Sequence, residues 1–115
     1  MTLFLVALGA ALGAPLRYVM AHLLDGRLPW GTIAVNLAGS FLLGLFSGAA
    51  LGGSTPGGAT LAFLGTGFCG GLTTFSAFAV QTHDHGPRLG SWNVLLTVVP
   101  ALTLCALGFW LGARA

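Results

Sequence analysis

Apolar positions fill four long runs of the chain, and polar or turn-forming residues gather between these runs. A helix that crosses the hydrocarbon core of a bilayer, roughly 30 Å thick, needs about 20 residues. The pattern predicts four membrane-spanning helices at residues 3–24, 30–51, 59–80 and 92–111. Turn residues separate them at residues 24–31, 52–58 and 82–91. We therefore expect an all-α membrane protein with a single four-helix domain over residues 1–115.

The third run differs from the others because it contains the segment GFCGGLTTFSAF, residues 67–78. A glycine pair near the middle of a span is a place where a helix kinks or unwinds. Such a break is tolerated only where it is buried in protein or faces water. We expect the third helix to break near its middle, between Gly70 and Thr73, and a kinked but continuous helix is the alternative. An unwound turn would free carbonyl oxygens for a hard cation.

Each run also contains two glycines four residues apart. Small residues at this spacing let helix backbones approach closely inside a membrane. The pairs are Gly9 and Gly13, Gly44 and Gly48, Gly67 and Gly71, and Gly108 and Gly112. Helix packing is the expected role of these pairs.

Composition supports the membrane class, since 56% of the residues are hydrophobic, 5% are charged and the mean hydropathy is +0.93. No Lys or Arg precedes the first run, which is also long for a signal-peptide core, so we expect a retained helix. The formal charge is +2. Three of the four arginines lie toward one side of the predicted bundle, and only Arg114 lies toward the other. The positive-inside rule therefore specifies orientation only weakly.

Several classes of function lack their characteristic residues. The chain has no basic cluster of the kind that nucleic acid requires. No Asp or Glu falls within a predicted span, so a proton-coupled transporter would lack its usual carboxylate. Cys69 and Cys105 show no metal-binding spacing, and we find no catalytic triad or phosphate-binding loop. We expect no enzyme.

Two polar residues inside the spans are candidates for function. Arg17 lies seven residues before the end of its span, where it either extends its charge to the interface or attracts anions at the mouth of a polar cavity. Asn36 either forms an interhelical hydrogen bond or donates to a pore. Ser40, one turn after Asn36, shares its helical face.

Phe75 and Phe78 are spaced for one helical face, and two hydroxyl residues, Thr74 and Ser76, flank them. Aromatic rings are positive at their edges, so edge-on rings favour an anion. Packing in a core or against lipid is the alternative for these two rings.

The residues now described resemble the Fluc (CrcB-type) fluoride channels. The resemblance covers nearly the whole chain, through GAPLRY in the first run, GTIAVNLAGSFLLG in the second and GFCGGLTTFSAF in the third. It implies an antiparallel homodimer of dual topology in the bacterial inner (plasma) membrane. Each dimer would have two fluoride pores and a central structural Na⁺, and would export fluoride passively from the cytoplasm.

The resemblance also implies roles for single residues. Gly70 and Thr73 would offer backbone carbonyls to Na⁺. The fluoride pore would be lined by Asn36, Thr74, Phe75, Ser76 and Phe78, and Ser40, Gln81 and Arg17 are further candidates for it. Two positions depart from the family pattern, because Ala77 stands where a threonine is usual and Gln81 where many members have glutamate.

Two alternatives to a channel stay open. A small dual-topology multidrug exporter is the first, although it should have a carboxylate in its first span. A structural membrane subunit whose glycines serve only assembly is the second.

Overall fold

The computed structural model describes residues 2–52 and 58–114. Its regular elements in these ranges are helices: α1 (Thr2–Leu24), α2 (Trp30–Leu51), α3 (Gly58–Thr60), η1 (Leu61–Cys69), α4 (Gly70–Leu72), α5 (Phe75–Asp84) and α6 (Gly86–Arg114). The third span comprises α3, η1, α4 and α5. Among the described residues, four stretches are long and apolar enough to cross a membrane, which confirms the predicted number of spans: Thr2–Leu24, Trp30–Leu51, Gly58–Asp84 and Gly86–Arg114.

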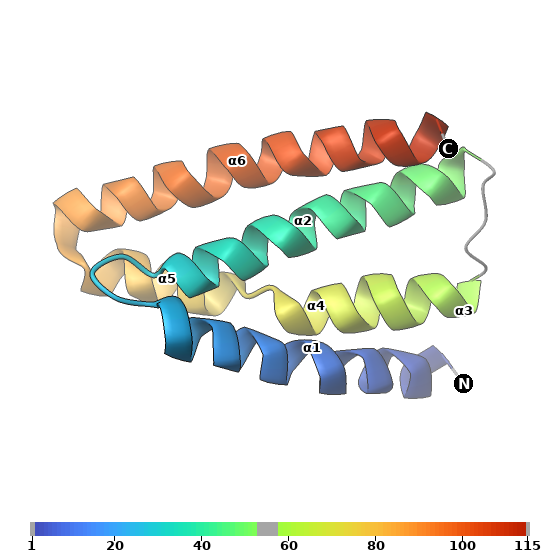
Figure 1. Cartoon of the computed structure of the whole chain (residues 1–115), viewed down its shortest axis with the longest axis horizontal. Helices are drawn as coiled ribbons and strands as arrows, with labels where there is room; N and C mark the ends of the chain where they lie inside the picture. Colours follow the sequence, from blue (N-terminus) through green and yellow to red (C-terminus); the bar gives the residue numbers. More distant parts are fainter. Residues whose placement is uncertain (1, 53–57, 115) are drawn as a thin grey trace.

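The spans associate as two pairs. Helix α6 lies along α2, and α1 lies along η1 and α4 (Figure 1). The two ends of the chain lie at the same end of the bundle, as an even number of crossings requires (Figure 1). The third span joins the two pairs, because its η1 and α4 pack on α1 whereas its α5 packs on α6.

The glycine pairs lie where these helices touch, which confirms their predicted packing role. A Cβ atom at Gly44 or Gly48 of α2 would overlap backbone atoms of α6. The same holds in reverse at Gly108 and Gly112 of α6, which lie against the α2 backbone. Between α1 and the third span, the close contacts are made by Gly9, Gly13, Gly67 and Gly71. Because the side chain of glycine is a single hydrogen atom, these glycines let the helix backbones approach closely in both pairs.

The third span breaks later than the glycine pair suggested. Gly70 and Gly71 are helical, and the extended residues are Thr73 (φ −86°, ψ 157°) and Thr74 (φ −153°, ψ 116°). The segment before them, η1, is a π-helix. The π-helical hydrogen bonding extends to Gly70, the first residue of α4, because the Gly70 N–H donates to the Gly65 carbonyl five residues back. The break was expected from glycine flexibility, but its position is set by partners on another helix, described below.

The first and third turns between spans are shorter than the sequence indicated. Residues 82–91 were expected to form a turn, but α5 continues to Asp84 and α6 begins at Gly86, whose φ of 79° reverses the chain. Asp25 stabilises the turn before α2 by accepting hydrogen bonds from the Thr32 N–H and hydroxyl, both at 3.0 Å. The predicted turn at 52–58 lies largely outside the described residues.

Candidate functional site

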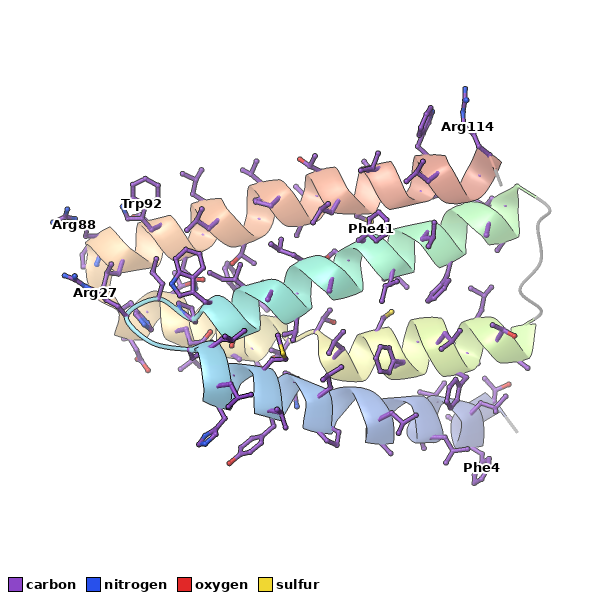
Figure 2. The ribbon with its side chains drawn as sticks, in the orientation of Figure 1. Phe4, Arg27, Phe41, Arg88, Trp92 and Arg114 are labelled. Atoms are coloured by element: carbon purple, nitrogen blue, oxygen red, sulfur yellow. The ribbon has the colours of Figure 1, made fainter. Side chains whose placement is uncertain are left out.

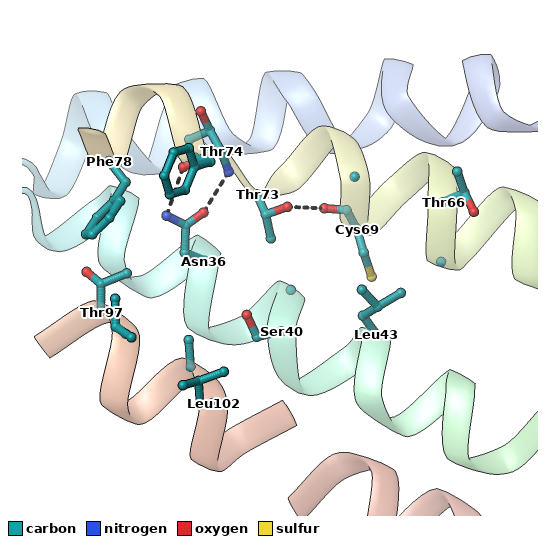
Figure 3. A pocket seen from close by; sticks show the side chains of 16 residues that line it. Asn36, Ser40, Leu43, Thr66, Cys69, Thr73, Thr74, Phe78, Thr97 and Leu102 are labelled. Atoms are coloured by element: carbon teal, nitrogen blue, oxygen red, sulfur yellow. Dashed lines mark hydrogen bonds between the residues drawn. The ribbon is translucent and has the colours of Figure 1, made fainter. Parts of the chain in front are cut away.

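Asn36 of α2 joins that helix to the break in the third span. The Thr74 N–H donates to Asn36 Oδ1 at 2.7 Å, and Asn36 Nδ2 donates to the Thr74 carbonyl oxygen at 3.1 Å (Figure 3). Both residues are buried. A buried extended segment must satisfy its backbone groups outside a helix. The Asn36 amide satisfies both groups of Thr74, so the interhelical hydrogen bond, one of the two roles considered for Asn36, is present.

The Thr74 side chain starts the next helix. Its hydroxyl accepts from the Ala77 N–H at 3.1 Å and caps the N-terminus of α5. The same hydroxyl lies 3.2 Å from the Ser76 hydroxyl. A threonine cap of this kind stabilises a helix by about 1 kcal/mol. Ala77 contributes its backbone to this cap, and its methyl group is absent from the groove described next.

Phe75 and Phe78 lie on the first turn of α5. Their ring centroids are 5.7 Å apart and the ring planes are tilted by 50°. The Phe75 side chain is 78% exposed in the single chain, whereas Phe78 is half-buried. The rings therefore lie together, and one of them stands at the protein surface.

A groove of about 620 Å³ runs between α2, the third span and α6. Figure 3 shows it with Asn36 and Ser40 on one wall, Thr73 and Phe78 on another, and Leu102 of α6 on the third. It is largely apolar, with polar groups in a few places. Seven of the sequence-predicted site residues line it: Asn36, Ser40, Gly70, Thr73, Thr74, Phe75 and Phe78.

The carbonyl oxygens of Gly70 and Thr73 have lost the donors that a continuous helix would supply. The Thr74 N–H, which would bond the Gly70 carbonyl, donates to Asn36 instead. The Ala77 N–H, which would bond the Thr73 carbonyl, donates to the Thr74 hydroxyl instead. The Thr73 hydroxyl donates back to the Cys69 carbonyl at 2.9 Å. Both rearrangements follow from the extended backbone at residues 73 and 74.

Three predicted site residues lie outside the groove lining. Ser76 reaches this site only through its contact with the Thr74 hydroxyl. Arg17 is half-buried on α1, apart from the groove. Gln81 instead belongs to a second polar cluster, where its Nε2 donates to Asp25 Oδ2 and to the Thr32 hydroxyl, both at 3.2 Å.

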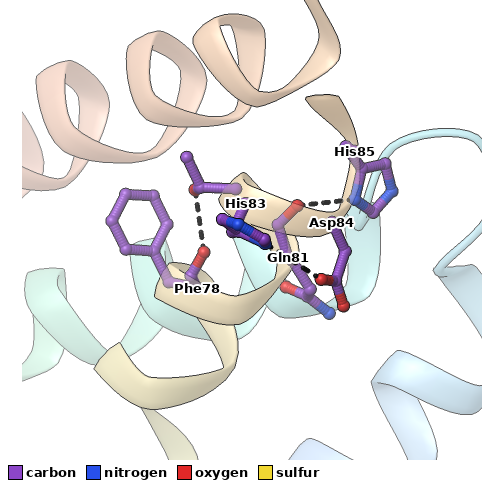
Figure 4. Close-up of polar contacts among 6 residues, drawn as sticks. Phe78, Gln81, His83, Asp84 and His85 are labelled. Atoms are coloured by element: carbon purple, nitrogen blue, oxygen red, sulfur yellow. Dashed lines mark hydrogen bonds and ion pairs between the residues drawn. The ribbon is translucent and has the colours of Figure 1, made fainter. Parts of the chain in front are cut away.

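The Gln81 cluster connects the base of α5 to the turn before α2. Among the described residues, Gln81 Oε1 is a buried oxygen with no hydrogen-bond donor. The Gln81 backbone carbonyl lies 2.7 Å from His85 Nδ1, so that ring nitrogen is the donor (Figure 4). The Gln81 side chain thus joins α5 to the turn before α2 and to α2 itself, whereas its backbone carbonyl binds the residue that caps the end of α5.

Sequence reasoning missed Asn93. This residue of α6 is 1% exposed, and its Nδ2 donates to the Thr82 hydroxyl at 2.9 Å. The Thr97 hydroxyl donates to Asn93 Oδ1 at 3.3 Å, and Thr97 lines the groove. The network joins α5 to α6, and Asn93 Nδ2 also lies 3.5 Å from the Phe78 carbonyl oxygen. The sequence feature that points to Asn93 is an amide side chain one turn before a threonine on a helix rich in apolar residues.

The sequence of the chain is similar to that of known proteins. A family model described as "CrcB-like protein, Camphor Resistance (CrcB)" matches residues 4–113. A "Fluoride-specific ion channel FluC 2" of Rhodococcus jostii is 45% identical, with 99% of this chain and 97% of the relative aligned. A "Fluoride-specific ion channel FluC 1" of Streptomyces avermitilis is 46% identical over 96% and 94% of the two chains. A "Fluoride-specific ion channel FluC" of Pyrococcus abyssi is 39% identical over 98% and 97%.

The matches span nearly the whole of both chains, and the structure has the four apolar helices of a multi-pass membrane protein. The protein therefore belongs to the CrcB family, and proteins named fluoride-specific ion channel FluC are among its relatives.

Proposed function

We propose that the protein is a passive, fluoride-selective channel that exports cytoplasmic fluoride across the bacterial inner membrane. The observation that carries the proposal is the groove that brings Asn36, Ser40, Phe75 and Phe78 together on one face of the chain. The relatives named fluoride-specific ion channels support the choice of ion.

The chemistry of the groove suits a small anion. Fluoride holds its water strongly, so a pathway must replace that water with hydrogen-bond donors. The Asn36 amide has two hydrogens, and Thr74 accepts one of them, which leaves the other to donate. The Ser40 hydroxyl and the positive edges of the Phe75 and Phe78 rings add further contacts. Arg17 and Gln81, outside the groove, are proposed to act at the approach to the pathway.

Passive transport is favoured by the groove lining, which contains no Asp, Glu or His among the described residues. A titratable base in the path is the usual device of proton-coupled transporters. The same lack of an acid argues against a multidrug exporter, which binds cations. Fluoride would therefore move down its electrochemical gradient.

The carbonyls of Gly70 and Thr73 fit a structural Na⁺. Backbone carbonyl oxygens are ligands for hard cations, and these two have lost their helical donors to Asn36 and to the Thr74 hydroxyl. Gly70 is exposed in the single chain and lines the groove. A bound Na⁺ would add positive potential near the anion path without adding a titratable group.

Two carbonyls from one chain are few for a hard cation, which favours a second copy. An antiparallel homodimer would supply the same pair from each subunit and would cover the exposed Phe75 ring. Symmetry would then give two pores. Dual topology suits the weak arginine asymmetry, since three arginines lie toward one side and one lies toward the other.

The test is ion efflux from liposomes that contain purified protein. The expected result is fast fluoride efflux with no measurable chloride efflux, and slower fluoride efflux when Na⁺ is replaced by a larger organic cation. Equal rates for the two halides, or no fluoride efflux, would refute the channel. Unchanged efflux without Na⁺, with no Na⁺ retained by the purified protein, would refute only the cation site.

A further inference from the structure

A second groove, of about 680 Å³, lies where the turn before α2 meets the start of α6. Figure 2 shows Arg27, Arg88 and Trp92 together at this end of the bundle, with Arg114 at the opposite end. The groove takes no part in the proposed fluoride path. Its lining includes two arginines, two tryptophans and two leucines that form an apolar floor: Arg27, Arg88, Trp30, Trp92, Leu89 and Leu96.

The electrostatics of this groove favour an anion. Both arginines are exposed, and no acidic residue lines the groove within the described parts of the chain. The two acidic residues of the protein have other contacts: Asp25 accepts from Thr32 and Gln81, and Asp84 lies 3.4 Å from the His83 ring. The start of α6 adds the positive end of a 29-residue helix dipole. A guanidinium pair in this setting is suited to bidentate contacts with phosphate oxygens.

The apolar part of the groove distinguishes a lipid from a free anion. Leu89 and Leu96 form part of the groove, and Leu95 and Val99 extend the same helix with 52% and 55% exposure. Tryptophan side chains such as Trp30 and Trp92 prefer the level of lipid headgroups. The volume of about 680 Å³ greatly exceeds that of one phosphate, and the exposed Trp92 of α6 lines the groove.

From these observations we infer that the groove binds an anionic phospholipid. The headgroup phosphate is held between Arg27 and Arg88, and the upper part of an acyl chain lies along Trp92 and Leu96. Basic pockets between membrane helices bind anionic headgroups in this way. The bound lipid would link the turn before α2 to the start of α6, and so stabilise the end of the bundle that holds the Gln81 cluster.

The test measures lipid binding to the purified full chain by native mass spectrometry, with phosphatidylglycerol and phosphatidylcholine of identical acyl chains. The control is Arg114→Gln, because Arg114 also lies over a tryptophan, with its guanidinium carbon 4.4 Å from the Trp110 ring centroid, but outside this groove. We expect the double variant R27Q/R88Q to bind phosphatidylglycerol at least about tenfold more weakly, from the loss of two charged contacts. R114Q should bind it as the unmodified chain does.

A second variant tests the apolar floor. Leu96→Trp fills the groove without changing charge, so it should weaken phosphatidylglycerol binding even if R27Q/R88Q proves unstable. The proposal is overturned if both variants retain the lipid, or if phosphatidylcholine binds as tightly as phosphatidylglycerol. It is also overturned if equimolar inorganic phosphate displaces the lipid, because the groove would then hold a free anion. Fluoride efflux in phosphatidylcholine vesicles reports separately on the channel.

Discussion

The side-chain amide of Asn36 pairs with both backbone polar groups of Thr74, at 2.7 Å and 3.1 Å, across 38 residues of sequence. This pairing lets the third span leave the helical conformation inside the membrane without unsatisfied backbone groups. It also directs the Thr74 N–H away from the Gly70 carbonyl. One amide therefore connects the helix break, the proposed cation ligands and the proposed anion path.

Asn36→Asp should impair both stability and transport. The substitution keeps an acceptor for the Thr74 N–H but sets a carboxylate oxygen against the Thr74 carbonyl. We expect a loss of about 1–3 kcal/mol in stability, the cost of an unsatisfied buried group, and little fluoride efflux at neutral pH. Thermal unfolding in detergent and liposome efflux measure the two effects. Ser40→Ala, one turn along the same groove, is the control for stability. Lower stability with normal efflux would mean that Asn36 serves the helix break alone.

Phe75→Ile and Phe78→Ile should each reduce fluoride efflux at least about tenfold, since the ring edges are lost while apolar volume is largely kept. The Phe75 ring is 78% exposed in the single chain and would be covered in the proposed dimer, so the oligomeric state of the Phe75 variant should be measured beside its efflux. Efflux from liposomes with equal protein content measures the effect. Unchanged flux in both variants would favour a structural subunit over a channel.

Gly48→Ala should destabilise the protein by about 1–3 kcal/mol or more, because the new methyl group overlaps the Phe109 carbonyl at the contact between α2 and α6. Gly58→Ala is the matched control, since a Cβ atom there meets nothing within 4 Å. Thermal unfolding of the two variants gives the comparison. Equal stability would show that α2 and α6 can separate at little cost.

Asp25→Ala should lower stability by about 1–2 kcal/mol through loss of the hydrogen bonds that begin α2. The Gln81 amide would lose a partner in the same variant. Asp84→Ala removes the other acidic residue of the chain, whose side chain is 66% exposed, and should change stability little. Denaturation of the two variants in the same detergent tests this difference, and equal losses would exclude a specific role for Asp25.

Thr74→Val should destabilise α5 by about 0.5–2 kcal/mol, because the Ala77 N–H loses its cap. Thr74→Ser retains the hydroxyl and should restore most of the stability. Hydrogen exchange at the Ala77 amide reports the cap directly, with faster exchange expected in the valine variant alone. Equal protection in both variants would show that another group satisfies this amide.

The sequence by itself determined the four spans and their glycine contacts. These follow from local patterns, since length and apolar content define a span and two glycines at helical spacing define a surface for close approach. The resemblance of three segments to one family was also a property of the sequence, and the family match over residues 4–113 agrees with it.

Only the tertiary structure decided where the third span breaks and which partners allow it. Glycine flexibility pointed to Gly70, but that residue is helical, and the chain extends at Thr73 and Thr74 because Asn36 on another helix supplies hydrogen bonds there. The burial of Asn93 and the assignment of Gln81 to the Asp25 cluster likewise depend on contacts between segments distant in sequence. Such contacts arise from packing geometry, which no local pattern of residues encodes.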